Sequence, residues 1–134
     1  MATTQARSNR ERGAVAVEFA VLLPVLLMIL LGIIEFGIAF NHQQGLHAAA
    51  REGARLASLP TSTSSQINTR VTDSLNGTGL KSPTISISPS AGQPCLNRSG
   101  QTVTVTVSAN QDIRIPFWKN ETVTLTGKGV FQCE

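Results

Sequence analysis

The longest apolar stretch of the chain lies near its N-terminus. Every residue at positions 19–34 is apolar or Gly, and after Glu35 the stretch resumes over 36–40. As a helix, these roughly 22 residues would be ~33 Å long, enough to cross the ~30 Å hydrocarbon core of a bilayer. Pro24 removes one backbone donor and should bend the helix, which membrane helices tolerate. The pattern predicts one membrane-spanning helix.

The helical pattern continues beyond this stretch. Residues 41–59 contain no Pro and are rich in Ala, Leu, Gln, Glu and Arg, until Pro60 and a Ser/Thr cluster end the helix. Small residues recur here at helical spacing, namely Ala50, Gly53, Ala54 and Ala57. We expect this stripe to pack on the protein's own sheet, the alternative being contact with a second protein's helix. Glu52 and Arg55 are spaced to form a weak ion pair.

The rest of the chain alternates between apolar and polar positions. Ile67, Val71 and Leu75 repeat every four residues, which predicts a short amphipathic helix over 66–76. Apolar residues alternate with Ser or Thr at 85–87, 103–107 and 123–125, which predicts strands, the first at a sheet edge between two prolines. We expect an α+β fold. A long N-terminal transmembrane helix extends outside the membrane and is followed by a short helix and a small antiparallel sheet of three or four strands.

Charge sets the direction in which the helix crosses the membrane. Arg7, Arg10 and Arg12 precede the apolar stretch, so the positive-inside rule keeps the N-terminus cytoplasmic and places the chain after about Asn41 outside. A signal peptide is the first alternative, but its apolar region is normally only about 7–15 residues long. The net charge of +3 is scattered without a basic stripe, so we expect no nucleic-acid partner. The lipid bilayer is the partner that this pattern requires.

The cysteines and histidines offer few sites for chemistry. Cys95 and Cys133 are the only cysteines, and both lie in the part expected outside, where disulfides persist. Pairing them would stabilise the fold by ~4 kcal/mol in the chain-entropy model, with two free thiols as the alternative. His42 and His47 are distant from them in sequence, so we expect solvated histidines and no metal site. Without catalytic motifs, we expect no enzyme, no cofactor and no small-molecule substrate.

The junction before the membrane helix carries the most specific signal, RGAVAVEF at residues 12–19. A carboxylate here is costly unless it is paired or hydrated, and Glu18 could simply lie among the lipid headgroups. Basic residues, a Gly, four small or apolar residues and a Glu resemble the processing site of type IV prepilins. With EFG at 35–37 and AAREGARLA at 49–57, residues 12–57 resemble the TadE-like family of pilin-like proteins in the tight-adherence (Tad, or Flp) pilus machinery.

The resemblance implies a processing site and a division of the chain. Prepilins are cut after the Gly by a membrane peptidase, here between Gly13 and Ala14, and Glu18 and Phe19 would then act in assembly. Glu35 is expected near the outer membrane boundary as a solvated or partly neutralised interface residue. The expected parts are a cytoplasmic leader (1–13), a transmembrane helix (14–40), an extracytoplasmic helix extension (41–59) and a small α+β extracytoplasmic domain (60–134).

The implied function is that of a minor pilin or pseudopilin in the assembly of a Tad (Flp) type IV pilus. Its partners would be other pilin-like subunits, the prepilin peptidase and the inner-membrane pilus platform. It would be a single-pass protein of the cell membrane and, after assembly, of the pilus. The alternative is a membrane-anchored cell-surface accessory protein that is never polymerised. Removal of the leader distinguishes the two.

Overall fold

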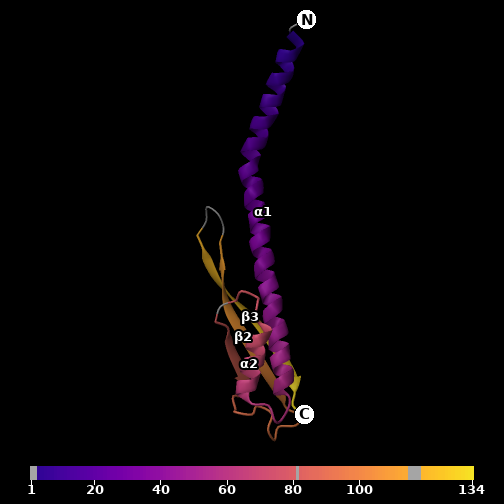
Figure 1. Cartoon of the computed structure of the whole chain (residues 1–134), viewed down its shortest axis with the longest axis vertical. Coiled ribbons are helices and arrows are strands. Elements are labelled where there is room, and N and C mark those ends of the chain that lie inside the picture. Colours follow the sequence, from indigo (N-terminus) through magenta and orange to yellow (C-terminus); the bar gives the residue numbers. More distant parts are fainter. Residues whose placement is uncertain (1–2, 81, 115–118) are drawn as a thin grey trace.

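One long helix carries a short helix and a small sheet on its C-terminal half, while its N-terminal half extends alone (Figure 1). The computed structural model describes residues 3–80, 82–114 and 119–134, with side chains from residue 13 onward. The elements are α1 (Thr3–Ala57), α2 (Ser64–Ser74), β1 (Thr84–Ser88), β2 (Thr102–Ile113) and β3 (Glu121–Gln132). The predicted α+β fold is confirmed.

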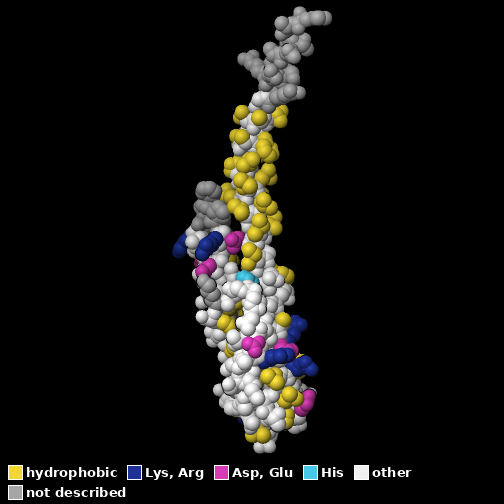
Figure 2. Space-filling model, viewed as in Figure 1, with side chains coloured by type: hydrophobic (Ala, Val, Ile, Leu, Met, Phe, Trp, Pro, Cys, Tyr) yellow, Lys and Arg dark blue, Asp and Glu magenta, His cyan; other side chains and the backbone are white. Residues whose placement is uncertain are grey.

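Helix α1 is continuous over 55 residues, which corresponds to ~82 Å at 1.5 Å per residue. The sequence predicted helix over 14–40 and 41–59. The structure ends this helix at Ala57 and extends it back to Thr3, so the expected leader and the chain after it share one helix. Pro24 lies within α1, which curves in its N-terminal half (Figure 1). Apolar side chains cover α1 from Val15 to Phe40, and none in its most apolar window is buried (Figure 2). The helix is long and apolar enough to cross a membrane.

Helix α2 confirms the predicted amphipathic segment, but it begins two residues earlier. Ile67 and Val71 are fully buried, and Leu75 follows them at the C-terminal cap. Thr63 and Gln66 form a capping box: the Thr63 hydroxyl accepts from the Gln66 N–H at 3.3 Å, and the Gln66 side chain accepts from the Thr63 N–H at 2.9 Å. This Thr-x-x-Gln spacing is present in the sequence and marks the true start of the helix.

The sheet is antiparallel with strand order β1-β2-β3. The short β1 lies at one edge, as its flanking prolines predicted, and Ile85 pairs with Val107. The 12-residue β3 forms the other edge along the whole of β2, and Gly129 pairs with Val105. The expected range of three or four strands resolves to three within the described residues. The segment 115–118, between β2 and β3, lies outside the description.

The core forms where one face of the sheet meets α1 and α2. Val103, Val105 and Val107 alternate inward from β2 and are fully buried. They face Leu46 of α1 and the four small residues of the stripe, all of which are also buried. The stripe therefore packs on the protein's own sheet and short helix, as predicted.

Glycines allow α1 and β3 to approach each other at backbone distance. A Cβ at Gly127 would overlap the Leu46 carbonyl, and a Cβ at Gly129 would overlap the Ala50 carbonyl and lie 2.7 Å from the Arg51 nitrogen. On the helix, a Cβ at Gly53 would overlap Val71 of α2. The sequence placed Gly53 in the small-residue stripe expected to pack on the sheet, but gave the two strand glycines no role. Their spacing of two in β3 is the signal that both face the same helix.

The ion pair expected within α1 is wrong. Glu52 instead pairs with Arg70 of α2, whose Nη2 and Nε lie 2.6 and 3.0 Å from Glu52 Oε1. This hydrogen bond lowers the pKa of Glu52, and the nearby charge of Arg55 acts in the same direction. The partner differs because tertiary packing brings α2 against α1, which spacing along one helix could not reveal.

The helix–strand contact gives a first testable prediction. Gly129→Ala should lower the free energy of unfolding by about 1–3 kcal/mol, because the added methyl must push β3 away from α1. Gly92→Ala is the matched control, since a Cβ there meets nothing within 4 Å. Pulse proteolysis of the detergent-solubilised full chain across a urea series measures both. Equal stability of the two variants would contradict the close contact.

Candidate functional site

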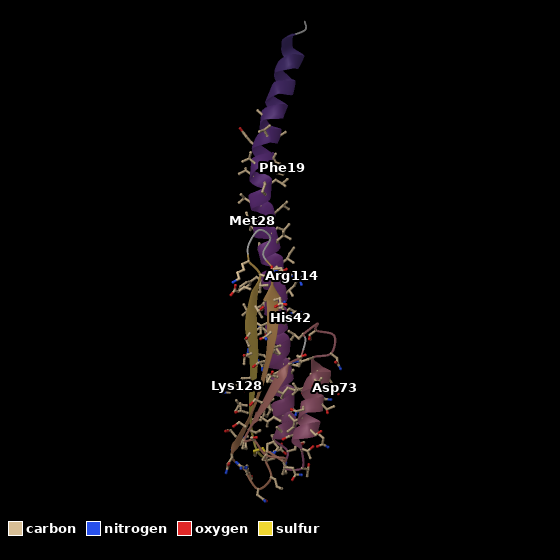
Figure 3. The ribbon with its side chains drawn as sticks, turned by 90° about the vertical axis from the view of Figure 1, so that its left-hand side faces the viewer. Phe19, Met28, His42, Asp73, Arg114 and Lys128 are labelled. Atoms are coloured by element: carbon tan, nitrogen blue, oxygen red, sulfur yellow. A yellow bond between two sulfur atoms is a disulfide. The ribbon has the colours of Figure 1, made fainter. Side chains whose placement is uncertain are left out.

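The residues that the sequence singles out for processing and assembly lie far from the sheet. Gly13, Ala14, Glu18 and Phe19 are all exposed on α1, and Figure 3 places Phe19 well away from the strands. A Cβ at Gly13 would meet nothing within 4 Å. Packing among the described residues therefore does not require a glycine at this position.

The helix also fixes how the expected cut relates to the carboxylate. Residues four apart on a helix are neighbours, so Ala14 and Glu18 lie one turn apart on the same face. Gly13 weakens the helix locally by about 1 kcal/mol relative to Ala. A peptidase must locally unwind a helix before it can cut a peptide bond within it. A glycine directly before Ala14 lowers the free-energy cost of unwinding the helix there.

Glu35 lies where the sheet domain meets the apolar helix. It is half-buried and lines a cavity of about 340 Å³ that also contains Asp112 and Arg114 of the β2 end. Figure 3 shows Arg114 beside α1 at the edge of the domain that faces the apolar half. The sequence gave Glu35 an interface role but gave no indication of these neighbours, because they come from a strand far along the chain.

Comparison with known proteins bears on the helix that carries these residues. Residues 13–55 match the family model described as TadE-like protein. The resemblance found in the sequence is thereby confirmed over this segment, and it associates the chain with the Tad pilus. No curated protein and no solved structure matches the chain.

The TadE-like segment joins two parts of the molecule. It begins at Gly13, contains Glu18 and Glu35, and ends at Arg55, within the part of α1 that packs on the sheet. The match therefore covers both the apolar half of the helix and the half that anchors the domain. Everything after α1, including the whole sheet, lies outside it.

A disulfide fastens the end of the sheet domain opposite the apolar half. Cys95 and Cys133 are bonded, with Cα atoms 5.4 Å apart and a sequence separation of 38. Next to it, the Glu134 N–H donates to the Ser58 carbonyl at 3.0 Å, and the Cys133 N–H donates to the Gln101 carbonyl at 2.7 Å. The end of β3 is thus tied both to the loop after β1 and to Ser58, directly after α1.

The sequence predicted solvated histidines, and this prediction does not hold for either of them. Both are half-buried, and His42 Nδ1 lies 2.6 Å from Gln111 Oε1 of β2, in hydrogen-bond contact. His47 Nε2 lies 3.1 Å from the Gln43 amide nitrogen, which in turn donates to the Thr126 carbonyl of β3 at 2.7 Å. These contacts hold α1 against both long strands, β2 and β3. Over residues 13–80, 82–114 and 119–134, no group of three His, Cys, Asp or Glu is placed to hold a metal ion.

The disulfide gives the second prediction. Replacing both cysteines by Ser should lower the free energy of unfolding by ~4 kcal/mol, because a long loop of the unfolded chain is no longer closed. Urea unfolding with and without reductant measures this: reductant should destabilise the natural chain and leave the double variant unchanged. Labelling of both thiols in the folded chain without reductant would show that the bond does not form.

Proposed function

We propose that the protein is a minor pilin or pseudopilin that takes part in assembly of a Tad (Flp) type IV pilus. A prepilin peptidase cuts it between Gly13 and Ala14, with residues 1–13 in the cytoplasm and the sheet domain outside. The observation that carries this proposal is the TadE-like match, which begins at Gly13 and runs through the apolar helix. Other pilin-like subunits and the inner-membrane pilus platform are its partners.

The exposed apolar surface of α1 supports the proposal that this helix passes from lipid into a bundle of helices. Phe19, Leu26 and Ile33 are about half exposed or more, and exposed large apolar side chains continue along α1 from Val15 to Phe40. An apolar surface of this extent is not stable in water and marks a membrane or protein contact. A bilayer covers the helix before assembly, and neighbouring subunit helices cover it afterwards.

Glu18 provides the specific contact within that apolar surface. Cutting after Gly13 creates an α-amine on Ala14, with an ordinary pKa of about 7.7–8.0, so it is largely cationic at neutral pH. A carboxylate and an amine at 4 Å attract by ~4 kcal/mol at an effective dielectric constant of 20, before the cost of desolvation. Leaving Glu18 unpaired in an apolar bundle costs several kcal/mol, so the pair sets the register of one subunit against the next.

Leader removal gives the third prediction. Gly13→Val should accumulate an uncut form that is longer by residues 1–13, because the β-branched side chain obstructs the peptidase and stiffens the helix before the cut. Gly32→Val is the matched control, since Gly32 lies on the same helix and a Cβ there also meets nothing within 4 Å. Intact mass of the protein purified from its own host measures the result. A leader retained in the natural protein would favour the unpolymerised accessory protein instead.

The carboxylate gives the fourth prediction. Glu18→Ala should leave membrane insertion and cleavage nearly intact but lower piliation and co-purification with other pilin-like subunits. Glu18→Asp should rescue only in part, because its shorter side chain reaches less far. Glu121→Ala, which removes an exposed carboxylate from the sheet domain, is the control. Normal pili in Glu18→Ala cells would show that Glu18 lies among the lipid headgroups and has no role in assembly.

A further inference from the structure

The cavity at Glu35 lies where the sheet domain reaches the apolar helix. Its lining comes from α1, from the loop between α2 and β1, and from the end of β2. Those residues are Glu35 and Ile38, then Gly79 and Leu80, then Asn110, Gln111, Asp112 and Arg114. A volume of about 340 Å³ is within the range of small-molecule sites. Its walls combine apolar side chains with charges of both signs.

The position of this cavity indicates where the bilayer surface lies. Polar strand residues cannot face hydrocarbon, so the end of β2 must remain among the headgroups or in water. Because that end lies beside Glu35, the outer boundary falls near Glu35 and not at Phe40. Residues 14–34 still give about 21 helical residues, or ~32 Å, which is enough to span the hydrocarbon. The cavity then opens at headgroup depth.

The charged side chains described around the cavity do not form ion pairs with one another. Asp112 accepts a hydrogen bond from the Thr122 hydroxyl at 2.8 Å. Among the described residues, Arg114 and Glu35 form no ion pair, although both line the cavity. A guanidinium and two carboxylates that line one cavity without a direct ion pair favour a ligand that brings both an anionic and a cationic group. Figure 2 shows this gathering of Lys, Arg, Asp and Glu on the part of the domain nearest the apolar helix.

We propose that this cavity binds the headgroup of a zwitterionic phospholipid with a primary ammonium, such as phosphatidylethanolamine. Arg114 binds the phosphodiester, for which its guanidinium is well shaped, while Glu35 and Asp112 accept hydrogen bonds from the ammonium. Ile38 and Leu80 provide an apolar wall for the adjoining glycerol. The proposal rests on the membrane topology given under the proposed function.

The same chemistry distinguishes this headgroup from the alternatives. A choline headgroup carries no N–H and cannot donate to Glu35 or Asp112. A glycerol headgroup leaves a net negative lipid facing two carboxylates, with only Arg114 to offset it. Free phosphoethanolamine has the right charges but lacks the apolar part that would contact Ile38 and Leu80.

The test uses the full chain reconstituted in nanodiscs of phosphatidylcholine mixed with phosphatidylethanolamine or with phosphatidylglycerol. Native mass spectrometry measures which lipids stay bound when the protein is released. Phosphatidylethanolamine should be retained about tenfold above its share of the bilayer, as expected for a charge-assisted hydrogen bond. Arg114→Gln and Glu35→Gln should each return retention to the bulk ratio, and Arg114→Lys should keep part of it. Lys128→Gln, which removes an exposed cation in β3, should change nothing.

Several outcomes would overturn the site. They are retention at the bulk ratio, a preference for phosphatidylglycerol, an unchanged Arg114→Gln variant, or equal displacement by free phosphoethanolamine at a concentration matched to the lipid. Each leaves the membrane anchor intact, because the chain is still in the nanodisc. A chain that cannot be reconstituted at all would overturn the anchor and the headgroup site together. An uncut leader would overturn the peptidase step and leave the lipid preference unchanged.

Discussion

The close approach of α1 to β3 is the contact on which the rest of the domain depends. Gly127 and Gly129 place strand backbone directly against the helix backbone at Leu46 and Ala50, and Gly53 leaves room on α1 for the Val71 side chain of α2. With α1 this near, the valines of β2 reach across to the helix and close a core from a chain with few aromatic residues. A larger spacing would leave that thin core unfilled, because packing contacts fall off steeply with distance.

This contact makes one helix serve two environments. The C-terminal half of α1 forms a wall of the sheet domain, and the N-terminal half has no partner among the described residues and presents apolar side chains on every side. Because the helix is unbroken between them, the orientation of the domain follows the orientation of the apolar half. His42 and Gln43 fasten the junction to β2 and β3, and the disulfide fastens the opposite end. In the function that we propose, such a protein can move from a bilayer into a helix bundle without rearranging its domain.

The boundary between the two halves of α1 is where the polar sheet domain meets the exposed apolar helix. The end of β2 reaches back along α1 as far as Glu35. Under the topology that we propose, the sheet domain therefore rests on the membrane and does not stand clear of it. Polar groups of the strand then need water or headgroups at that depth. Glu35 and Arg114 are brought together at this height by the fold and not by their positions in the sequence.

The sequence by itself determined the elements whose signals are local. Apolar length predicted the membrane helix, the period of four predicted α2, and alternation predicted the strands, because each pattern depends only on the geometry of its own segment. The junction residues 12–19 likewise identified the TadE-like segment. Only the tertiary structure decided the Glu52–Arg70 pair, the Gly127 and Gly129 contact and the charges around Glu35. Each of these depends on the distance between segments far apart in the chain, and that distance is set by how closely α1 packs on the sheet.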